Sequence, residues 1–470
     1  MTRPRVRCLS SEVTRKELKK KWDAVIVGGG HNGLTAAAYL ARSGLSVAVL
    51  ERRHVIGGAA VTEEIIPGFK FSRCSYLQSL LRPSVLRELE LKRHGLKLFK
   101  PIATVFTPCI DGRYLLLWPD DHRNYEEISK FSKRDAEAYQ RYEDQLQKFS
   151  KTLHFLWDST PPEILAGSSS FTEWLKDKLN KSLFWARFLR HAFSLGQKDM
   201  VEFVDLILSP TSKVLDYWFE ASINAPGSGY ELLHHVMGQS DDHPNVWLHV
   251  EGGMGSISLA ISNAAKEAGA YILTNAEVSH VMINDNGRVS GVLLADGTQI
   301  QSSIVLSNAT PYKTFTDLVP QGVLPNDFLH QILQSDYSTY TPYSPSDGSW
   351  EDPAYREAFA QKCYGLIDEY APGFRSSVIG YDMLTPPDLE RVFGLTGGNI
   401  FHGAMTLNQI FLLRPIKGCF RGAYRSGYRT PVKGLYLCGS GTHPGGGVTG
   451  GPGRNAAFTV LRDINKKTRG

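Results

Sequence analysis

Near the N-terminus, two short apolar runs are separated by a helix-forming segment. The run Asp23–Val27 is short, β-branched and apolar, as in a fully buried parallel strand, and a second such run covers Leu45–Leu50. Between them, the alanine-rich segment Leu34–Arg42 is typical of a helix and is followed by Ser43-Gly44. Together these segments predict one βαβ unit of a doubly wound parallel sheet.

A long helical pattern covers residues 130–240. Its clearest part is an amphipathic helix with a capping-box pattern at Ser132. Apolar side chains recur there at spacings of three and four, at Tyr139, Tyr142, Leu146, Phe149, Leu153 and Leu156. The next stretch is rich in aromatic residues, most of which we expect in a core and a minority around an apolar ligand chamber.

The pattern changes to that of strands in the second half of the chain. Turn signals at Asn286-Gly287 and Asp296-Gly297 predict a small antiparallel meander. The candidate strands are Tyr271–Leu273, Glu277–Ile283, Val289–Leu294 and Thr298–Leu306. Near the C-terminus, one more strand, Gly434–Cys438, precedes a glycine-rich turn and a helix from Arg454.

The composition is globular, with 42% hydrophobic and 21% charged residues among 470. No apolar run is long enough to cross a bilayer, so we expect no transmembrane segment, while peripheral membrane contact stays open. The net charge of +5 comes from residues 1–22, which carry +6 and leave −1 for the rest. A nearly neutral body argues against nucleic acid as a partner. Nothing in the sequence identifies a protein partner.

The basic N-terminal extension, residues 1–22, has two interpretations. An arginine-rich leader suggests a mitochondrial transit peptide and a location in the matrix, although Glu12 and Glu17 weaken that hypothesis. The alternative is a solvated tail on a cytoplasmic protein. The six cysteines stand far apart, with no C-x-x-C pair, so the sequence indicates neither a dithiol redox centre nor a clustered metal site.

The glycine turn after the first strand carries the strongest chemical signal. Gly28-x-Gly30-x-x-Gly33 opens a helix directly after a strand, and Glu51 ends the next strand. Gly28 allows a tight turn, Gly30 allows backbone to approach a pyrophosphate, and Gly33 allows close helix packing. The helix N-terminus attracts phosphates, and Glu51 can accept hydrogen bonds from ribose hydroxyls. A carboxylate there disfavours the 2′-phosphate of NADP.

The pattern continues through Ala37, Gly44, Val47 and Glu51 to Gly57-Gly58. This longer series resembles the FAD-binding fingerprint of glutathione-reductase-type flavoproteins. No second complete motif of this kind occurs, because the runs at Gly253 and Gly439 lack the third glycine and the acidic residue. A separate NAD(P)H domain is therefore not expected.

The C-terminal segment narrows the resemblance. Leu435-Tyr-Leu-Cys-Gly-Ser-Gly-Thr-His-Pro-Gly-Gly-Gly447-Val-Thr-Gly450 is similar to the closing flavin motif of the carotenoid (phytoene) desaturase and isomerase family. The runs Glu251–Ile257, Thr385–Asp388 and Gly397–Asn399, and the residues Gln409 and Arg414-Pro415, fit the same family. The resemblance covers nearly all of the chain after residue 22.

The resemblance implies an α/β flavoprotein with a glutathione-reductase-type (Rossmann-like) FAD-binding domain and an interleaved, largely helical substrate domain. The FAD-binding domain would comprise residues 23–100, 240–312 and 425–470, and the substrate domain residues 101–239 and 313–424. The residues expected to contact FAD are Gly28, Gly29, Gly30, His31, Asn32, Gly33, Glu51, Arg52, Gly57, Gly58, Val278, Gly439, Ser440, Gly447 and Val448. No metal and no catalytic acid or base is indicated.

The implied activity is an FAD-dependent oxidoreductase of the dehydrogenase, desaturase or isomerase type, in which flavin N5 takes a hydride from a hydrophobic small-molecule substrate. Ala59 stands where related amine oxidases often have arginine, which disfavours an amine oxidase. Ser440 stands where many flavoproteins have aspartate. Pro311 and Tyr340 are closer together than in the family, so the substrate domain is expected to be shortened. A non-enzymatic flavin-binding or scaffold protein stays open as an alternative.

Overall fold

The computed structural model describes residues 21–160, 171–219, 247–339, 341–406, 409–410, 414 and 428–467. Nearly all of the basic N-terminal extension, and the end of the helical pattern predicted up to residue 240, lie outside these residues. Within the described ranges, no helix is both long and apolar enough to cross a membrane.

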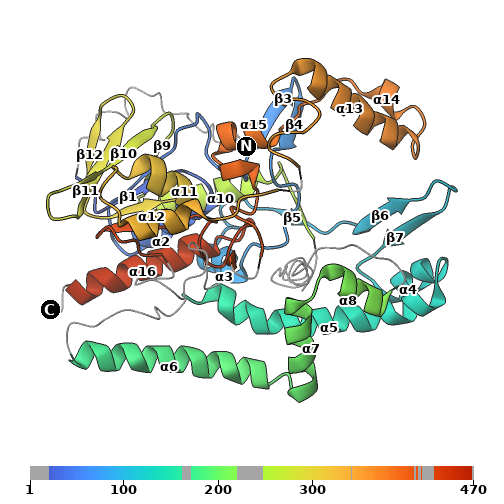
Figure 1. The fold of residues 1–470 in the computed structure, drawn as a ribbon, viewed down its shortest axis with the longest axis horizontal. Coiled ribbons are helices and arrows are strands. Elements are labelled where there is room, and N and C mark those ends of the chain that lie inside the picture. The colour runs from blue at the N-terminus through green and yellow to red at the C-terminus, as the bar shows by residue number, and fades with distance from the viewer. Residues whose placement is uncertain are drawn as a thin grey trace, which may run out of the picture.

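A five-stranded parallel sheet forms the centre of the fold (Figure 1). Its spatial order is β14-β13-β1-β2-β9, and each neighbouring pair of strands is parallel. The strands are β1 (Ala24–Val27), β2 (Val47–Leu50), β9 (Tyr271–Leu273), β13 (Val305–Ser307) and β14 (Leu435–Leu437). Helix α2 (His31–Arg42) joins β1 to β2 and confirms the predicted βαβ unit.

Side chains of β1 are buried on both faces of this sheet, which explains its uninterrupted apolar run. Ala24 and Ile26 pack on one side against helices α2, α10 (Gly255–Glu267) and α16 (Gly451–Lys467). Val25 and Val27 pack on the other side, against an antiparallel sheet. That second sheet consists of β10 (Val278–Ile283), β11 (Val289–Leu294) and β12 (Gln299–Gln301). The helices, the parallel sheet and the meander form three layers.

The prediction of one strand over Thr298–Leu306 is wrong. Its first half is β12 in the meander, and its second half is β13 in the parallel sheet. Ser302 causes the change of sheet, because its hydroxyl donates to Asp23 O and accepts a hydrogen bond from Ile304 N, both at 3.2 Å. A side chain that bonds to local backbone interrupts the ladder of a strand.

A helical region lies beside these layers (Figure 1). Its core is the aromatic-rich cluster around Phe149, Trp157 and Phe203. The amphipathic helix begins as predicted, with Ser132 Oγ accepting a hydrogen bond from Asp135 N at 3.2 Å. The helices are α4 (Asp121–Ser129), α5 (Lys133–Asp158), α6 (Phe171–Phe193), α7 (Gln197–Leu208) and α8 (Thr211–Trp218).

Short elements connect and surround the two regions. The paired strands are β3 (Thr62–Ile66) with β4 (Phe69–Ser72), β5 (Leu98–Phe99) with β8 (His249–Val250), and β6 (Val105–Pro108) with β7 (Tyr114–Leu117). The short helices are α3 (Pro83–Glu88), α11 (Pro311–Lys313), η2 (Thr314–Leu318), α12 (Asn326–Leu333), α13 (Pro353–Asp368), α14 (Phe374–Ser377), α15 (Pro386–Phe393) and η3 (Thr396–Gly398). Of these, η2 and α12 pack on the meander through Phe315 and Phe328.

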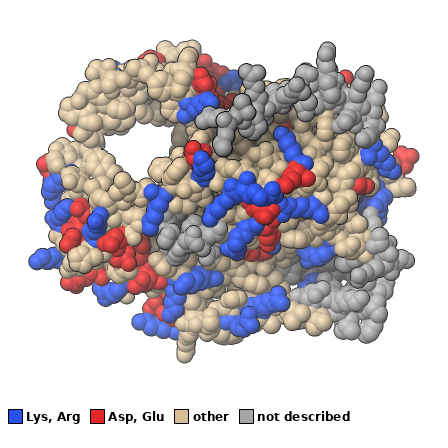
Figure 2. Space-filling view, turned by 180° about the vertical axis from the view of Figure 1, so that it is seen from behind, with Lys and Arg blue, Asp and Glu red and all other residues tan. Residues whose placement is uncertain are grey.

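The hairpin β6–β7 and the pair α13–α14 project from one side of the molecule; we call them the outer segments (Figure 1). Figure 2 shows an opening through the molecule on this side. Large apolar side chains remain exposed on both outer segments, including Phe106, Tyr114, Leu366 and Tyr370. The outer segments are therefore less completely packed than the layers that carry the candidate site.

Candidate functional site

The turn between β1 and α2 has the geometry that its glycines predict. Gly28 has a φ of +96° and donates from its N–H to Leu50 O at 2.8 Å. A Cβ on Gly33 would lie 2.2 Å from Gly28 O, so only glycine lets α2 start against the turn. The N-terminus of α2 consequently faces the carboxyl edge of the parallel sheet, where such folds bind phosphates.

Glu51 is held at the end of β2 by two backbone donors. Its Oε2 accepts from Gly29 N at 2.7 Å, and its Oε1 accepts from Arg53 N at 2.9 Å. The residue is 5% exposed and lines the main cavity. Because each carboxylate oxygen can accept more than one hydrogen bond, Glu51 keeps acceptor capacity for hydroxyl groups of a ligand.

The two glycine turns, far apart in sequence, meet at the other end of the site. Asn32 Nδ2 donates to Ser440 Oγ at 2.9 Å, and His31 Nε2 lies 3.2 Å from Gly447 O. Gly57 N donates to Gly29 O at 2.9 Å and brings the Gly57-Gly58 segment onto the same edge. The turns therefore face one another across a single cleft, as the motif pattern requires.

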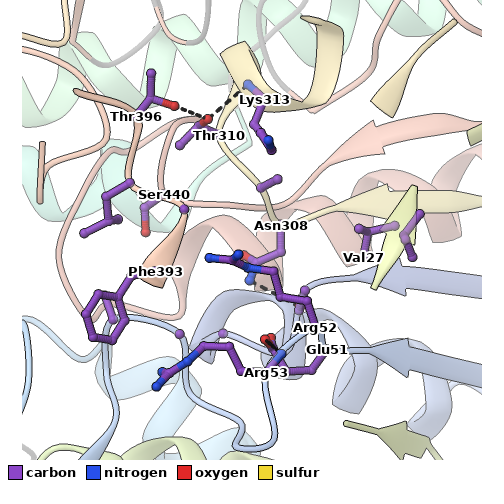
Figure 3. Close-up of a pocket in the computed structure, with 18 of the residues that line it drawn as sticks. Val27, Glu51, Arg52, Arg53, Asn308, Thr310, Lys313, Phe393, Thr396 and Ser440 are labelled. Carbon is purple, nitrogen blue, oxygen red and sulfur yellow. Dashed lines mark hydrogen bonds between the residues drawn. The ribbon is translucent and has the colours of Figure 1, made fainter. Parts of the chain in front are cut away.

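A cavity of about 470 Å³ runs along this edge. In Figure 3, Glu51, Arg52 and Arg53 lie at one side of it, Ser440 and Thr396 at the other, and Asn308 between them. A second cavity of about 170 Å³ adjoins it and has a mostly apolar lining. The residues that line both cavities are His31, Ala59, His402 and Ser440. We call these four residues the window.

Most of the predicted cofactor residues line these cavities. Those at the larger cavity are Gly28, Gly30, His31, Asn32, Glu51, Arg52, Gly58, Val278 and Ser440, and Gly447 and Val448 line the smaller one. Gly29, Gly33, Gly57 and Gly439 do not line either cavity. They shape the backbone behind it; a Cβ on Gly439, for example, would lie 2.7 Å from Asn308 O.

Arg53 and Asn308 line the larger cavity but were not among the predicted residues. The Arg53 guanidinium bonds Glu63 Oε1 at 2.7 Å and lies 4.9 Å from the centre of the Phe393 ring. Asn308 follows β13 and donates from Nδ2 to Gly28 O at 3.3 Å. Ligands bind at the carboxyl ends of parallel strands, and Asn308 directly follows such a strand, β13. The sequence analysis did not indicate Asn308, because it placed this strand in the antiparallel meander.

Arg52 closes the cavity beside Glu51. Its Nη2 donates to Arg391 O at 2.9 Å and to Val392 O at 2.7 Å, at the end of α15. Arg52 therefore joins the end of β2 to a segment more than three hundred residues later. Its role in the structure is to connect the two walls of the cavity, in addition to any contact with a ligand.

Burial keeps the window uncharged near neutral pH. It lowers the pKa of His31 to about 4, although the hydrogen bond to the Gly447 carbonyl acts in the opposite direction. It likewise raises the pKa of Cys74, in the smaller cavity, to about 12, so that thiol stays protonated. The smaller cavity therefore presents neutral groups to whatever enters it.

Three residues that line the larger cavity each have a buried polar side-chain atom with no hydrogen-bond partner in the described part of the chain. The atoms are Asn32 Oδ1, Arg53 Nη1 and His402 Nδ1. Such atoms are costly unless a ligand or ordered water pairs with them. A cationic nitrogen near the end of β2, together with neutral groups at the window, fits a nucleotide cofactor with a phosphate portion and a polar ring.

His443, in the C-terminal glycine turn, lines neither cavity. It is fully buried, and its Nε2 lies 2.7 Å from Leu156 O at the end of α5. Tyr428 donates from its hydroxyl to His443 O at 2.7 Å. His443 therefore connects the C-terminal glycine turn to the helical region, and its role is structural.

Other kinds of centre find no support in the described residues. No group of three or more His, Cys, Asp and Glu side chains within them is arranged to hold a metal ion. The cysteines described, Cys74, Cys109, Cys363 and Cys438, are free thiols. The glycine turn, Glu51 and the cavity at the carboxyl edge of the parallel sheet are those of a Rossmann-like fold that binds a flavin or nucleotide cofactor. Residues 26–84 match the family described as the NAD(P)-binding Rossmann-like domain.

The chain belongs to the family of "Pyridine nucleotide-disulfide oxidoreductase domain-containing protein 2". It is 40% identical to that protein from Rattus norvegicus, over 95% of this chain and 94% of the relative. It is 22% identical to the phytoene desaturase (lycopene-forming) of Pantoea ananas, over 93% of this chain and 99% of that enzyme. A structure of putrescine oxidase bound to putrescine shares the fold, with a TM-score of 0.53 and 18% identity over 95% and 99% of the two chains.

The alignment with the rat protein also bears on the predicted shortening. It extends over 558 positions, whereas this chain has 470 residues, so at least 88 positions have no counterpart here. The chain is therefore shorter than this relative within the aligned region, in the direction that the sequence predicts; the location of the shortening between Pro311 and Tyr340 stays a prediction.

Proposed function

We propose that the protein is an FAD-dependent oxidoreductase of the dehydrogenase, desaturase or isomerase type that acts on a hydrophobic substrate. The observation that carries the proposal is the continuous cavity between the two glycine turns, with a second, mostly apolar cavity at its window. The first has the chemistry of a dinucleotide site, and the second has that of a chamber for an apolar molecule.

Glu51 and the backbone at Val278 would hold the adenosine end of FAD. Glu51 is already oriented by its two backbone donors, so it pays little conformational entropy on binding ribose hydroxyls. The N-terminus of α2 and Arg53 would hold the pyrophosphate, since a helix N-terminus and a guanidinium both attract phosphate. Bound FAD would supply the acceptor for a hydride, which carries the electron pair of a substrate C–H bond.

The smaller cavity would position the substrate and exclude water from it. Leu77, Leu80 and Ile400 contribute apolar surface, and Tyr76 and Trp247 pack with ring centres 6.4 Å apart. The neutral state of His31 and Cys74 favours an uncharged substrate, because no fixed charge there would pair with an ionic one. This chemistry supports a hydrocarbon-like donor over an amine, in agreement with the alanine at position 59.

Reconstitution with FAD tests the proposal first. We expect the purified protein to be yellow or to take up added FAD, and to prefer FAD to NADP because Glu51 repels a 2′-phosphate. Anaerobic reduction of the bound flavin by a panel of uncharged polyene and monoterpene hydrocarbons then tests the substrate class. A colourless protein that takes up no FAD contradicts the proposal, and hydrogen peroxide release with amines alone would favour an amine oxidase.

A second candidate is a protein that binds FAD without turning over a substrate. The at least 88 positions of the rat relative that have no counterpart in this chain favour it, since a substrate chamber built partly from those positions would be incomplete here. In this case the flavin would bind normally and no hydrophobic donor would reduce it. Restoring the relative's additional positions to this chain would then restore reduction.

We further propose a mitochondrial location, supported by the basic residues of the N-terminal extension. Fusing residues 1–22 to a fluorescent protein tests it. Import into the matrix is the expected result, and a diffuse cytoplasmic signal would contradict it.

A further inference from the structure

His402 is the residue at the window that no sequence motif indicated. It lines both cavities, together with His31, Ala59 and Ser440. Its Nδ1 is buried and has no hydrogen-bond partner among the residues that the structure describes. An imidazole nitrogen in that position either loses hydrogen-bonding free energy or pairs with a bound molecule.

The backbone of His402 is in a conformation that most residues with a Cβ avoid. Its φ is +57°, in the left-handed region, where non-glycine residues are uncommon. Glycine would adopt this conformation at no steric cost, yet a histidine stands here. Unfavourable backbone geometry of this kind persists where the surrounding structure imposes it, often at binding sites.

Asn399 and the side chain of Arg414 fix the loop on either side of His402. Asn399 Oδ1 accepts from Phe401 N at 2.8 Å, and Asn399 O accepts from His402 N at 3.1 Å. The buried guanidinium of Arg414 donates to Phe401 O at 2.9 Å and to Gly403 O at 3.0 Å. The imidazole is therefore presented to the window by a loop whose backbone is bonded immediately before and after it.

The same guanidinium ties this loop to the C-terminal glycine turn. Arg414 Nη1 also donates to Ser440 O at 3.0 Å. The turn lies so close that a Cβ on Gly446 would be 2.6 Å from Phe401 Cα. His402 is thus held in a fixed relation to the segment that the family resemblance assigns to the flavin end of the site.

The electrostatics of the window suit a hydrogen bond to a neutral ring. Burial, with smaller contributions from Arg414 and His31, lowers the pKa of His402 to about 3. The imidazole is neutral near pH 7, so one ring nitrogen is a donor and the other an acceptor. A neutral donor or acceptor binds polar ring atoms without placing a second cation beside Arg414.

We propose that His402 is a binding residue for the flavin: its imidazole, at the window between the two cavities, forms a hydrogen bond with a polar atom of the isoalloxazine ring. The inference rests on the proposed function, because it requires that FAD occupy the larger cavity. It assigns the residue to the cofactor and not to the substrate, since the proposed apolar substrate offers no polar atom to an imidazole.

His402→Gly is the decisive variant, because it removes the imidazole and at the same time relieves the backbone. A purely structural histidine at positive φ predicts a more stable apoprotein and unchanged FAD affinity. A flavin ligand predicts a more stable apoprotein with FAD affinity weakened about fivefold, the amount that one hydrogen bond is worth. The flavin absorbance spectrum and midpoint potential of the bound cofactor are also expected to change, without any substrate present.

Glu90→Gly is the matched control, since Glu90 also has a positive φ of 53° and lies away from both cavities. It is expected to leave FAD affinity, spectrum and potential unchanged. His402→Asn, which tolerates the left-handed conformation and keeps a polar group, replaces the glycine variant if that one does not fold. Wild-type affinity, spectrum and potential in the His402 variants would overturn the inference. Failure of the wild-type protein itself to bind FAD would reject the proposed function first.

Discussion

The parallel sheet buries its apolar side chains, whereas the outer segments leave several of theirs exposed. All of Ala24–Val27 in β1 is buried, between the helices on one face and the meander on the other. In the hairpin β6–β7, by contrast, Val105 is 44% exposed and Phe106 is 63% exposed. The strand β1 is entirely apolar and lies between two layers, whereas β6 also contains Thr107 and Pro108 and keeps its apolar side chains exposed.

This contrast separates the part of the molecule that is fully packed from the part that is not. The layers around the sheet are complete and carry the candidate cofactor site. In the outer segments, beside the opening in Figure 2, large apolar side chains such as Phe106 and Leu366 stay exposed. The rat relative has at least 88 positions with no counterpart in this chain, and we expect that some of them cover this exposed surface.

The largest expected effect is in stability. Ile26→Ala removes a side chain with 0% exposure from the parallel sheet and should lower the free energy of unfolding by about 2–5 kcal/mol. Ile110→Ala makes the same chemical change at a residue with 74% exposure, in the turn of the outer hairpin, and should change it by less than about 0.5 kcal/mol. Urea denaturation of both variants measures the difference. Equal losses would show that the hairpin is packed in solution, contrary to the comparison.

Glu51→Gln tests the site within the well-packed layers. The glutamine side chain keeps one oxygen that can accept from a backbone N–H, but it carries no charge. Its NH₂ group replaces the second oxygen and faces the other backbone N–H, to which it cannot bond. Hydrogen bonds to a charged group are worth about 1.5–3 kcal/mol, so FAD affinity should fall roughly 10- to 100-fold. Flavin fluorescence titration gives the dissociation constant. In the outer segments, Glu357→Gln serves as the control and should leave that constant unchanged.

The dependence of stability on pH should come from the buried histidines. The folded-state pKa of His31 is about 4, below the 6.5 of an unperturbed histidine, so the unfolded chain binds more protons between these values. Stability is therefore fully present above about pH 6.5 and is lost as the pH falls towards 4. The outer segments, residues 105–117 and 353–377, contain no histidine and contribute nothing to this loss.

Thermal unfolding at pH 7 and pH 5 checks this expectation. His31→Gln should reduce the decrease in Tm between the two pH values. His122→Gln, at a side chain that is 83% exposed, should leave the decrease as it is in the wild type. The same slope in all three proteins would mean that other groups dominate acid unfolding.

The smallest effect is expected at the surface of the outer segments. Leu366→Lys replaces a side chain that is 54% exposed on α13 and should leave both Tm and FAD affinity unchanged. It should reduce binding of a dye that reports exposed apolar surface, and reduce self-association at high concentration. Unchanged dye binding would indicate that α13 is covered in solution.

Local sequence was sufficient for much of the fold. The βαβ unit, the amphipathic helix after Ser132 and the first three candidate strands of the second half were all predicted, because their signals lie within a dozen residues of one another. The strand over Thr298–Leu306 was wrong at its centre. Its apolar residues fit one strand, and only the contact between Ser302 and Asp23 shows that the chain changes sheets there.

The residues of the candidate site were likewise predicted only in part. Glycines with a required backbone shape, such as Gly28 and Gly33, are recognisable from spacing alone, because no other residue fits the turn. Arg53 and Asn308 carry no such signal, since an arginine or an asparagine is tolerated at most surface positions. Their place at the cavity depends on which strands become neighbours.

By itself, the sequence determined that a dinucleotide-binding turn forms near the N-terminus and that a second glycine turn forms near the C-terminus. Only the tertiary structure decided that the two turns touch through Asn32 and Ser440, and that His402 rather than His443 reaches the window between the cavities. The physical reason is the distance along the sequence between the residues that interact. Backbone shape is set by neighbouring residues, whereas a binding site is assembled from contacts between segments hundreds of residues apart, whose free energy depends on the packing of the whole chain.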